Sequence, residues 1–203
     1  MKAKTLVDLG DELLISDPLR LALISDADTK LIRDLFCDED TAQKVLLRPA
    51  LQTEPELKQT LQQLLSVQTY AICFEGETEP VGIIGLQPTR GEDATTLSFF
   101  AAIQSKHRRQ GYCTGAMRLL FSRVFATSQH EEIGAWTNLD FFQELQPIYE
   151  HWKFHPTLLF TLMQMLDSSA GSPLGYYVLE RENFLRSFPR AAEQPARISG
   201  AME

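Results

Sequence analysis

The chain contains little cysteine, no long hydrophobic run and fewer basic than acidic residues. Its three cysteines, Cys37, Cys73 and Cys113, are odd in number and follow no metal-ligand spacing. We therefore expect free thiols in a reducing cytoplasm, and neither a disulfide framework nor a metal site. No apolar run reaches the roughly 20 residues that cross a membrane, and the first residues lack the apolar core of a signal peptide. These absences predict a cytoplasmic protein without a membrane partner.

The charge balance excludes another class of partner. The net charge of -8, from 19 basic and 27 acidic residues, argues against a general nucleic-acid binder and would suit a cationic amine substrate. At 203 residues, with 44% hydrophobic residues, the chain is long enough for one domain with a sizeable core. Residues 186–203 lose hydrophobic periodicity and gain proline and charge. We predict a single domain over 1–185 and a C-terminal tail over 186–203.

Hydrophobic periodicity and turn residues predict the element order β-α-α-β-β-β-α-β-α-β-β. The expected elements are strands at 12–16 and 19–24, a helix capped by Ser25 or Asp26, a helix opened by the capping box Thr53-Glu-Pro-Glu56, strands at 70–74, 81–86 and 95–103, a helix after 111, a strand at 133–136, a helix before 153, and strands at 157–163 and 174–179. This order implies an α+β fold, with a mixed sheet and helices on both faces.

The most informative stretch is the basic turn at residues 103–116, with the sequence IQSKHRRQGYCTGA. It follows an apolar, strand-like run and precedes an amphipathic helical run. Free N–H groups at a helix N-terminus, with arginine side chains beside them, are suited to bind a phosphate. Gly111 and Gly115 would let the backbone approach a ligand closely. The turn has neither the dinucleotide nor the P-loop pattern, and an ordinary exposed polar turn is the alternative.

Residues 108–113 resemble the acyl-CoA-binding motif of the GCN5-related N-acetyltransferases (GNAT), Gln/Arg-x-x-Gly-x-Gly/Ala, with Cys113 at the last position. Gly-Tyr-Cys-Thr-Gly-Ala is also similar to the Gly-Tyr-Ala-Thr-Glu-Ala of the ribosomal-protein (RimJ/RimL) branch. Residues 132–138 resemble the next strand of that branch, which ends in Asn. Residues 148–154 resemble its Leu-Tyr-Glu-Lys-x-Gly-Phe, with Lys153 replacing Gly. The resemblance covers about residues 12–184.

This resemblance implies a mixed, mostly antiparallel GNAT-like sheet, acetyl-CoA as co-substrate, no metal, and direct acetyl transfer to a primary amine. The strand before the motif would part from its neighbour and expose backbone groups to pantetheine. Arg108 and the N–H groups of residues 110–115 would hold the pyrophosphate. The residues assigned to the cofactor by this resemblance are Phe100, Ala101, Ala102, Ile103, Arg108, Arg109, Gln110, Gly111, Tyr112, Cys113, Thr114, Gly115 and Asn138. For Asn138, a helix N-cap is the alternative role.

The resemblance also assigns Tyr149 as the general acid that protonates the leaving thiolate. An ordinary phenol has a pKa near ~10 and is protonated at neutral pH. The alternative is a packing aromatic, because Tyr149 belongs to an apolar series at helical spacing. Pro147 would disturb a helix here, so the helix is expected to begin near Gln146 instead. Cys113 is expected to be a free thiol and not a nucleophile, with a pKa lowered by the helix N-terminus.

No carboxylate lies within residues 95–103, and we name no general base. Deprotonation of the amine through water is the simplest alternative. The missing base, together with Cys113, Pro147 and Lys153, leaves a second interpretation open: a non-catalytic acyl-CoA-binding or protein-interaction module on the same fold. A third interpretation is a regulatory homodimer that binds no CoA. The acceptor amine, whether a protein N-terminus, a small molecule or an antibiotic, depends on loops that the sequence does not define.

Overall fold

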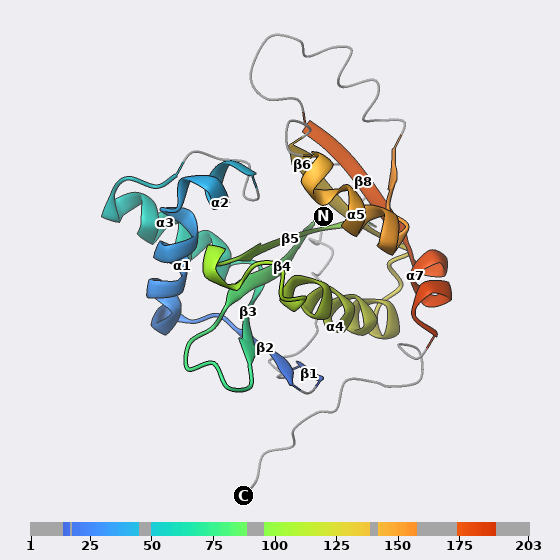
Figure 1. The fold of residues 1–203 in the computed structure, drawn as a ribbon, viewed down its shortest axis with the longest axis horizontal. Coiled ribbons are helices and arrows are strands. Elements are labelled where there is room, and N and C mark those ends of the chain that lie inside the picture. Colours follow the sequence, from blue (N-terminus) through green and yellow to red (C-terminus); the bar gives the residue numbers. More distant parts are fainter. Residues whose placement is uncertain are drawn as a thin grey trace, which may run out of the picture.

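A mixed sheet of eight strands forms the centre of the computed structural model, which describes residues 14–16, 18–44, 50–88, 96–138, 142–157 and 174–189 (Figure 1). In chain order the elements are β1 (Leu14–Ser16), β2 (Leu19–Leu23), a 3-10 turn (Asp26–Asp28), α1 (Thr29–Phe36), α2 (Glu39–Lys44), α3 (Glu54–Leu65), β3 (Gln68–Phe74), β4 (Gly82–Pro88), β5 (Thr96–Ile103), a second 3-10 turn (Ser105–His107), α4 (Tyr112–Thr127), β6 (Glu132–Asn138), α5 (Phe142–Trp152), β7 (His155–Pro156), β8 (Leu174–Glu180) and α7 (Arg181–Ser187). The predicted α+β class is confirmed.

The strands lie in the order β1-β2-β3-β4-β5-β6-β8-β7. All neighbouring pairs are antiparallel except β5 and β6, which run parallel. A parallel pair needs a crossover connection, and α4 provides it between these two strands. The basic turn therefore lies where the chain leaves β5 for α4, at the only parallel pair among the described strands.

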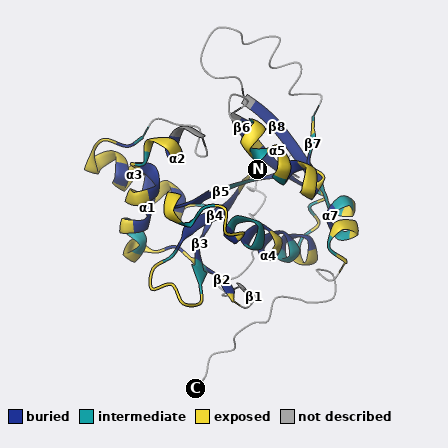
Figure 2. Ribbon diagram, in the orientation of Figure 1, coloured by how far each residue is buried: buried dark blue, intermediate teal, exposed yellow. Residues whose placement is uncertain are grey.

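Helices cover both faces of the sheet and bury its hydrophobic side chains (Figure 2). On one face, α4, α5 and α7 pack Phe121, Trp152 and Phe184, all fully buried, against β5, β6 and β8. On the other face, α1 and α3 pack Ile32 and Leu57 against β3 and β4. Figure 1 shows α1, α2 and α3 together on one side of the molecule and α5 and α7 on the other side.

Local sequence signals located the starts of α3 and α4 correctly, whereas the N-cap of α1 is Asp28 and neither Ser25 nor Asp26. Ser25 caps the first 3-10 turn, and the capping box of Thr53 and Glu56 opens α3 as predicted. Two helices, α2 and α7, were not predicted. Because α7 continues to Ser187 and the Phe188 ring lies 4.5 Å from that of Trp152, residues 186–188 also pack on the domain. Residues 158–173 and 190–203, where a strand and most of the tail were expected, lie outside the described residues.

Pro147 lies inside α5, so the predicted helix start near Gln146 is wrong. The helix begins five residues before the proline, at Phe142. Another residue at position 147 would donate its N–H to a carbonyl in the first turn of α5, and the proline removes this one hydrogen bond. Phe142 holds that turn in place, because its ring stacks on Tyr177 of β8 with centroids 5.1 Å apart and planes 12° apart. Aromatic packing across the sheet thus offsets an unfavourable local sequence.

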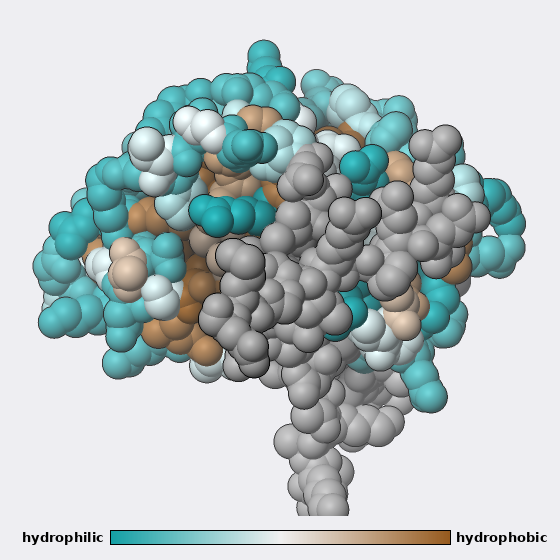
Figure 3. All heavy atoms as spheres, turned by 90° about the horizontal axis from the view of Figure 1, so that it is seen from below, coloured by the Kyte–Doolittle hydropathy of each residue, from teal (hydrophilic) through white to brown (hydrophobic). Residues whose placement is uncertain are grey.

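The described surface is mainly hydrophilic on the face shown in Figure 3, with smaller hydrophobic areas beside the residues drawn in grey. None of the helices in the described ranges combines the length and the apolar sequence that a bilayer span requires. The same ranges bring no three histidine, cysteine, aspartate or glutamate side chains together as metal ligands would be.

Candidate functional site

The site lies where the parallel strands β5 and β6 stop pairing. Their paired residues run from Thr96 with Glu132 to Phe99 with Ala135. Beyond this point β5 still pairs with β4 as far as Ile103, and β6 still pairs with β8 as far as Asn138. Among the described strands, none pairs with the edge of β5 that faces β6 after Phe99. Backbone N–H and C=O groups of this edge have no strand partner and could bind a ligand with amide groups, except that the carbonyl of Ile103 accepts a bond from Arg108.

The turn after β5 directs the N-terminus of α4 toward this opening. Gly111 is the N-cap of α4, with the left-handed φ of 83° that favours glycine. The first bond of the helix joins the N–H of Gly115 to the carbonyl of Gly111 at 2.9 Å. The N–H groups of residues 112–114 therefore have no acceptor within the helix. A side chain at Gly111 would meet no atom within 4 Å, so the backbone is exposed at this position.

Two residues of the turn face the protein interior and not a ligand. Tyr112 is buried, with its ring 4.8 Å from that of Phe74, so only its backbone faces the opening. Gly115 would place a side chain 3.4 Å from Leu19, and its N–H is already bonded to Gly111. The side-chain position of Gly115 thus faces β2, and the contact of its backbone with a ligand stays a prediction.

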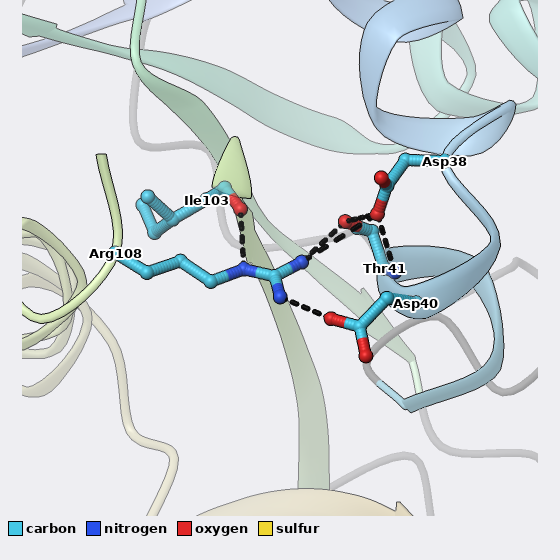
Figure 4. A network of polar contacts seen from close by, with 5 residues as sticks. All are labelled: Asp38, Asp40, Thr41, Ile103 and Arg108. Carbon is cyan, nitrogen blue, oxygen red and sulfur yellow. Dashed lines mark hydrogen bonds and ion pairs between the residues drawn. The ribbon is translucent and has the colours of Figure 1, made fainter. Parts of the chain in front are cut away.

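Arg108 uses its donors within the protein (Figure 4). Its Nε donates to the carbonyl of Ile103, the last residue of β5, at 3.2 Å. Its guanidinium also donates to the carboxylate of Asp40 and the hydroxyl of Thr41, and lies 3.7 Å from Asp38. Asp38 in turn accepts the N–H of Thr41 at 2.7 Å at the start of α2. The arginine thus joins the end of β5 to α2.

This network changes the role expected for Arg108, because two carboxylates neutralise the charge that was assigned to the pyrophosphate. Arg109 and Lys106 are the exposed cations of the turn. His107 is largely buried, with its Nδ1 3.9 Å from a carboxylate oxygen of Glu77. The sequence did contain a signal for α2, since Asp38 and Thr41 have the spacing of an N-cap and its partner. That signal did not reveal the partner of Arg108.

Burial controls the chemistry of Cys113, the second residue of α4. Its Sγ lies 3.9 Å from the Sδ of Met117. Burial raises the pKa of the Cys113 thiol to about 11. The expectation of a lowered pKa at the helix N-terminus is therefore wrong, because desolvation of the thiolate outweighs the helix dipole. Cys113 is a protonated thiol that packs at the base of the turn.

Tyr149 reaches the opening from α5. Its hydroxyl shares a hydrogen bond with the hydroxyl of Thr137, two residues beyond the last β6 residue that pairs with β5. Its ring stacks on Tyr177 with centroids 4.9 Å apart and planes 13° apart. Burial raises the pKa of the phenol to about 12, although the bond to Thr137 acts in the opposite direction. Tyr149 is thus both a packing aromatic and a buried, protonated hydroxyl beside the opening.

Thr137 and Tyr177 were not predicted as site residues. The alternation of Ile133, Ala135 and Thr137 along β6 could have placed the threonine on the face that α5 covers. The tyrosine is recognised only from the pairing of β8 with β6. Asn138 is the last residue of β6 and pairs with Leu174, and its side chain lies outside the described residues.

Of the acidic and histidine side chains that could act as a general base, Glu131 and His151 lie away from the opening. Glu131 lies 3.4 Å from Arg181, at the other end of β6. The ring of His151 packs 6.0 Å from that of Phe188, on α7's side of the helix. Glu92 and Asp93 lie outside the described residues.

We expect the Arg108 network to stabilise the fold. Arg108→Gln should lower the free energy of unfolding by about 1 kcal/mol, because the partly exposed ion pairs are screened while the bond to Ile103 is lost. Arg109→Gln, in the same turn but exposed, should change it by less than about 0.5 kcal/mol. Urea unfolding measures both values. Equal losses in the two variants would contradict a special role for Arg108.

The raised pKa of Cys113 predicts slow alkylation. A thiol with a pKa near 11 is ionised in roughly one molecule in 3,000 at pH 7.5, and only the thiolate reacts. Iodoacetamide should therefore modify the exposed Cys37 at least about 10-fold faster than Cys113, as followed by peptide mass spectrometry. The rate at Cys113 should rise with pH up to the pKa. Comparable rates at both cysteines at pH 7.5 would show that burial does not protect the thiol.

Comparison with known proteins identifies the family. A family model described as an acetyltransferase (GNAT) domain matches residues 19–140, which include the turn and all of β6. The acetyltransferase (GNAT family) from Bacillus anthracis has a similar structure, with a TM-score of 0.67 and 14% identity over 84% of this chain and 99% of that chain. A GCN5-related N-acetyltransferase from Brucella melitensis gives a TM-score of 0.64 and 14% identity over 91% and 83%.

FdhC, described as a nucleotide-linked sugar GNAT, gives a TM-score of 0.66 and 11% identity over 90% of this chain and 98% of that chain. No curated protein matches the chain. At these identities the structural similarity establishes the fold, while the family model covers more than half of the sequence. The chain therefore belongs to the GNAT family and is an acetyl-CoA-dependent acetyltransferase.

Proposed function

We propose that this acetyltransferase transfers the acetyl group directly to a primary amine, either a protein N-terminus or a small-molecule amine, as in the RimJ/RimL branch that its turn resembles. The observation that carries the proposal is the opening between β5 and β6, which has free backbone donors at one end and the hydroxyl of Tyr149 beside it.

Backbone groups supply most of the cofactor site in this proposal. The N–H groups of Gln110 to Thr114 and the exposed side chain of Arg109 would hold the pyrophosphate at the N-terminus of α4. The unpaired edge of β5, residues 100–103, would pair with the amide groups of pantetheine. Asn138 would contact the same arm from the end of β6. Arg108 would act indirectly, by holding the turn against α2.

When bound, acetyl-CoA supplies an activated thioester. The N–H groups on the free edge of β5 are suited to stabilise the negative charge that develops on its carbonyl oxygen. Tyr149 would donate a proton to the leaving sulfur. Burial keeps this phenol protonated at neutral pH, as a donor requires. No carboxylate lies on β5 in the described range, so water is the proposed acceptor of the amine proton.

The acceptor would approach from the face opposite α5, because Phe142, Tyr149 and Tyr177 fill the α5 face. On the opposite face, Trp136 follows the last paired residue of β6 and stacks on Tyr176 with centroids 4.8 Å apart. Trp136 is 37% exposed. An aromatic side chain in this position would contact the acceptor, where it could bind an apolar group or a cation.

We expect Gly111→Asp to weaken CoA binding at least ~10-fold, or ~1.4 kcal/mol, because a carboxylate would repel the pyrophosphate at the α4 N-terminus. Gly111→Asn is the matched control, since it has the same size and the same left-handed backbone but no charge. It should bind CoA more tightly than Gly111→Asp. Calorimetry measures the dissociation constants. Equal affinity of folded Gly111→Asp and the unsubstituted protein would remove the turn from the cofactor site.

Tyr149→Phe should lower kcat by ~10²–10⁴ while the dissociation constant of CoA changes only a few-fold, because the ring remains and only the proton donor is lost. Tyr177→Phe is the matched control in the same ring stack. The assay follows release of the CoA thiol with a panel of peptide and small-molecule amines. A near-normal kcat in Tyr149→Phe would mean that another group supplies the proton. Tight CoA binding without turnover of any amine would favour the non-catalytic module.

A further inference from the structure

A pair of buried hydroxyl groups lies beside the opening between β5 and β6. Thr137 of β6 is 1% exposed and Tyr149 of α5 is 6% exposed, and their hydroxyl oxygens are hydrogen-bonded. Either oxygen can act as the donor of this bond. A buried hydroxyl without a partner is costly, so each of these groups constrains the proton of the other.

The direction of this bond decides what Tyr149 can do. A phenol has one proton, and if it donates that proton to Thr137 it has none to direct at a leaving sulfur. If Thr137 donates instead, the proton of Tyr149 is free to point elsewhere. The same bond then stabilises negative charge on the phenol oxygen, because a hydrogen bond to a charged acceptor is the stronger kind.

Thr137 is the hydrogen-bond partner described for the Tyr149 hydroxyl, and the other neighbours lie against its ring. Phe142 and Phe154 contribute only rings, at centroid distances of 5.9 and 5.2 Å. The titratable groups around it are the phenol of Tyr177 from β8 and the thiol of Cys113 from α4, both uncharged at neutral pH. These two groups raise the pKa of Tyr149, as burial does, whereas the bond to Thr137 lowers it.

We propose that Thr137 is a positioning residue for acetyl transfer: it donates a hydrogen bond to the oxygen of Tyr149 and directs the phenol proton at the leaving sulfur. The proposal rests on the proposed function of Tyr149. As the amine nitrogen bonds to the acetyl carbon and the carbon–sulfur bond breaks, the phenol proton moves to the sulfur. Thr137 stabilises the resulting phenolate until it takes a proton from water, which has accepted the proton of the amine.

The activity test compares Thr137→Val, which removes the hydroxyl, with Thr137→Ser, which keeps it. Thr137→Val should lower kcat about 10-fold or more, with CoA affinity and the amine KM within about 3-fold, and Thr137→Ser should restore most of the rate. Thr69→Val is the matched control. Thr69 is a fully buried threonine of β3 whose hydroxyl donates to the carbonyl of Leu64 at 2.9 Å. In the sheet, β4 separates β3 from β5 and therefore from the opening. Thr69→Val should leave kcat unchanged.

A double variant separates positioning from packing. In the Tyr149→Phe background, Thr137→Val should cause less than about a 2-fold further loss of kcat, because the hydroxyl that it positions is already absent. A purely structural effect of Thr137 would persist in that background and would overturn the proposal. A normal kcat in Thr137→Val alone would overturn it as well. A normal kcat in Tyr149→Phe would show that Tyr149 is not the general acid, and would overturn both the proposed function of Tyr149 and this proposal.

A second measurement needs neither turnover nor CoA. With 3-fluorotyrosine at position 149, fluorine NMR reports the ionisation of this phenol in the free protein. Because a donated hydrogen bond stabilises the phenolate, the phenol should titrate at higher pH in Thr137→Val than in Thr137→Ser. The same midpoint in both variants would show that Thr137 does not donate to Tyr149, and would overturn the proposal even if no amine is accepted as substrate.

Discussion

The site depends on one constraint: β5 and β6 pair in parallel over only a short stretch and are then held apart by their outer neighbours. Gly82 and Gly85 of β4 allow β5 to lie close on that side. A side chain at Gly82 would come within 2.3 Å of the Ala102 carbonyl, and one at Gly85 would come within 2.3 Å of the Phe100 ring. On the other side, β6 follows β8. The sheet therefore contains a fixed opening whose backbone groups face each other without pairing.

The charge distribution around the opening favours recognition by backbone groups. The protein carries a net charge of -8, and the motif arginine Arg108 is held by Asp38 and Asp40 of the α2 region. The groups of the turn that then remain to attract an anion are the α4 N-terminus and the exposed side chains of Lys106 and Arg109. The same network joins α2 to the end of β5 and to the basic turn through the single side chain of Arg108. A substitution that moves Arg108 would therefore alter the contacts of both segments.

Tyr149 shows how one residue combines two roles that sequence reasoning treats as alternatives. Its ring belongs to a stack with Phe142 and Tyr177, which fixes the first turn of α5 despite Pro147. Its hydroxyl is hydrogen-bonded to that of Thr137, where β5 and β6 part. Packing determines where the oxygen lies, and burial keeps it protonated. The aromatic stack is therefore part of the chemistry that we propose for the site.

The sequence by itself determined the features that depend on neighbouring residues. It predicted the strand, turn and helix around Gly111, the capping box of Thr53, the α+β class and the GNAT family. These succeed because caps, turns and amphipathic faces are set within a few residues of chain. The RimJ/RimL branch and the individual site roles of Asn138, Arg109 and Tyr149 stay predictions.

Only the tertiary structure decided which partners the side chains meet. The carboxylates that hold Arg108 lie some 70 residues before it in the chain. The desolvation that reverses the expected pKa shift of Cys113 comes from packing around α4. The bond between Thr137 and Tyr149 and the stack that tolerates Pro147 also join separate elements. Hydrogen bonds, burial and ring contacts depend on distances in space, which no local pattern of the sequence specifies.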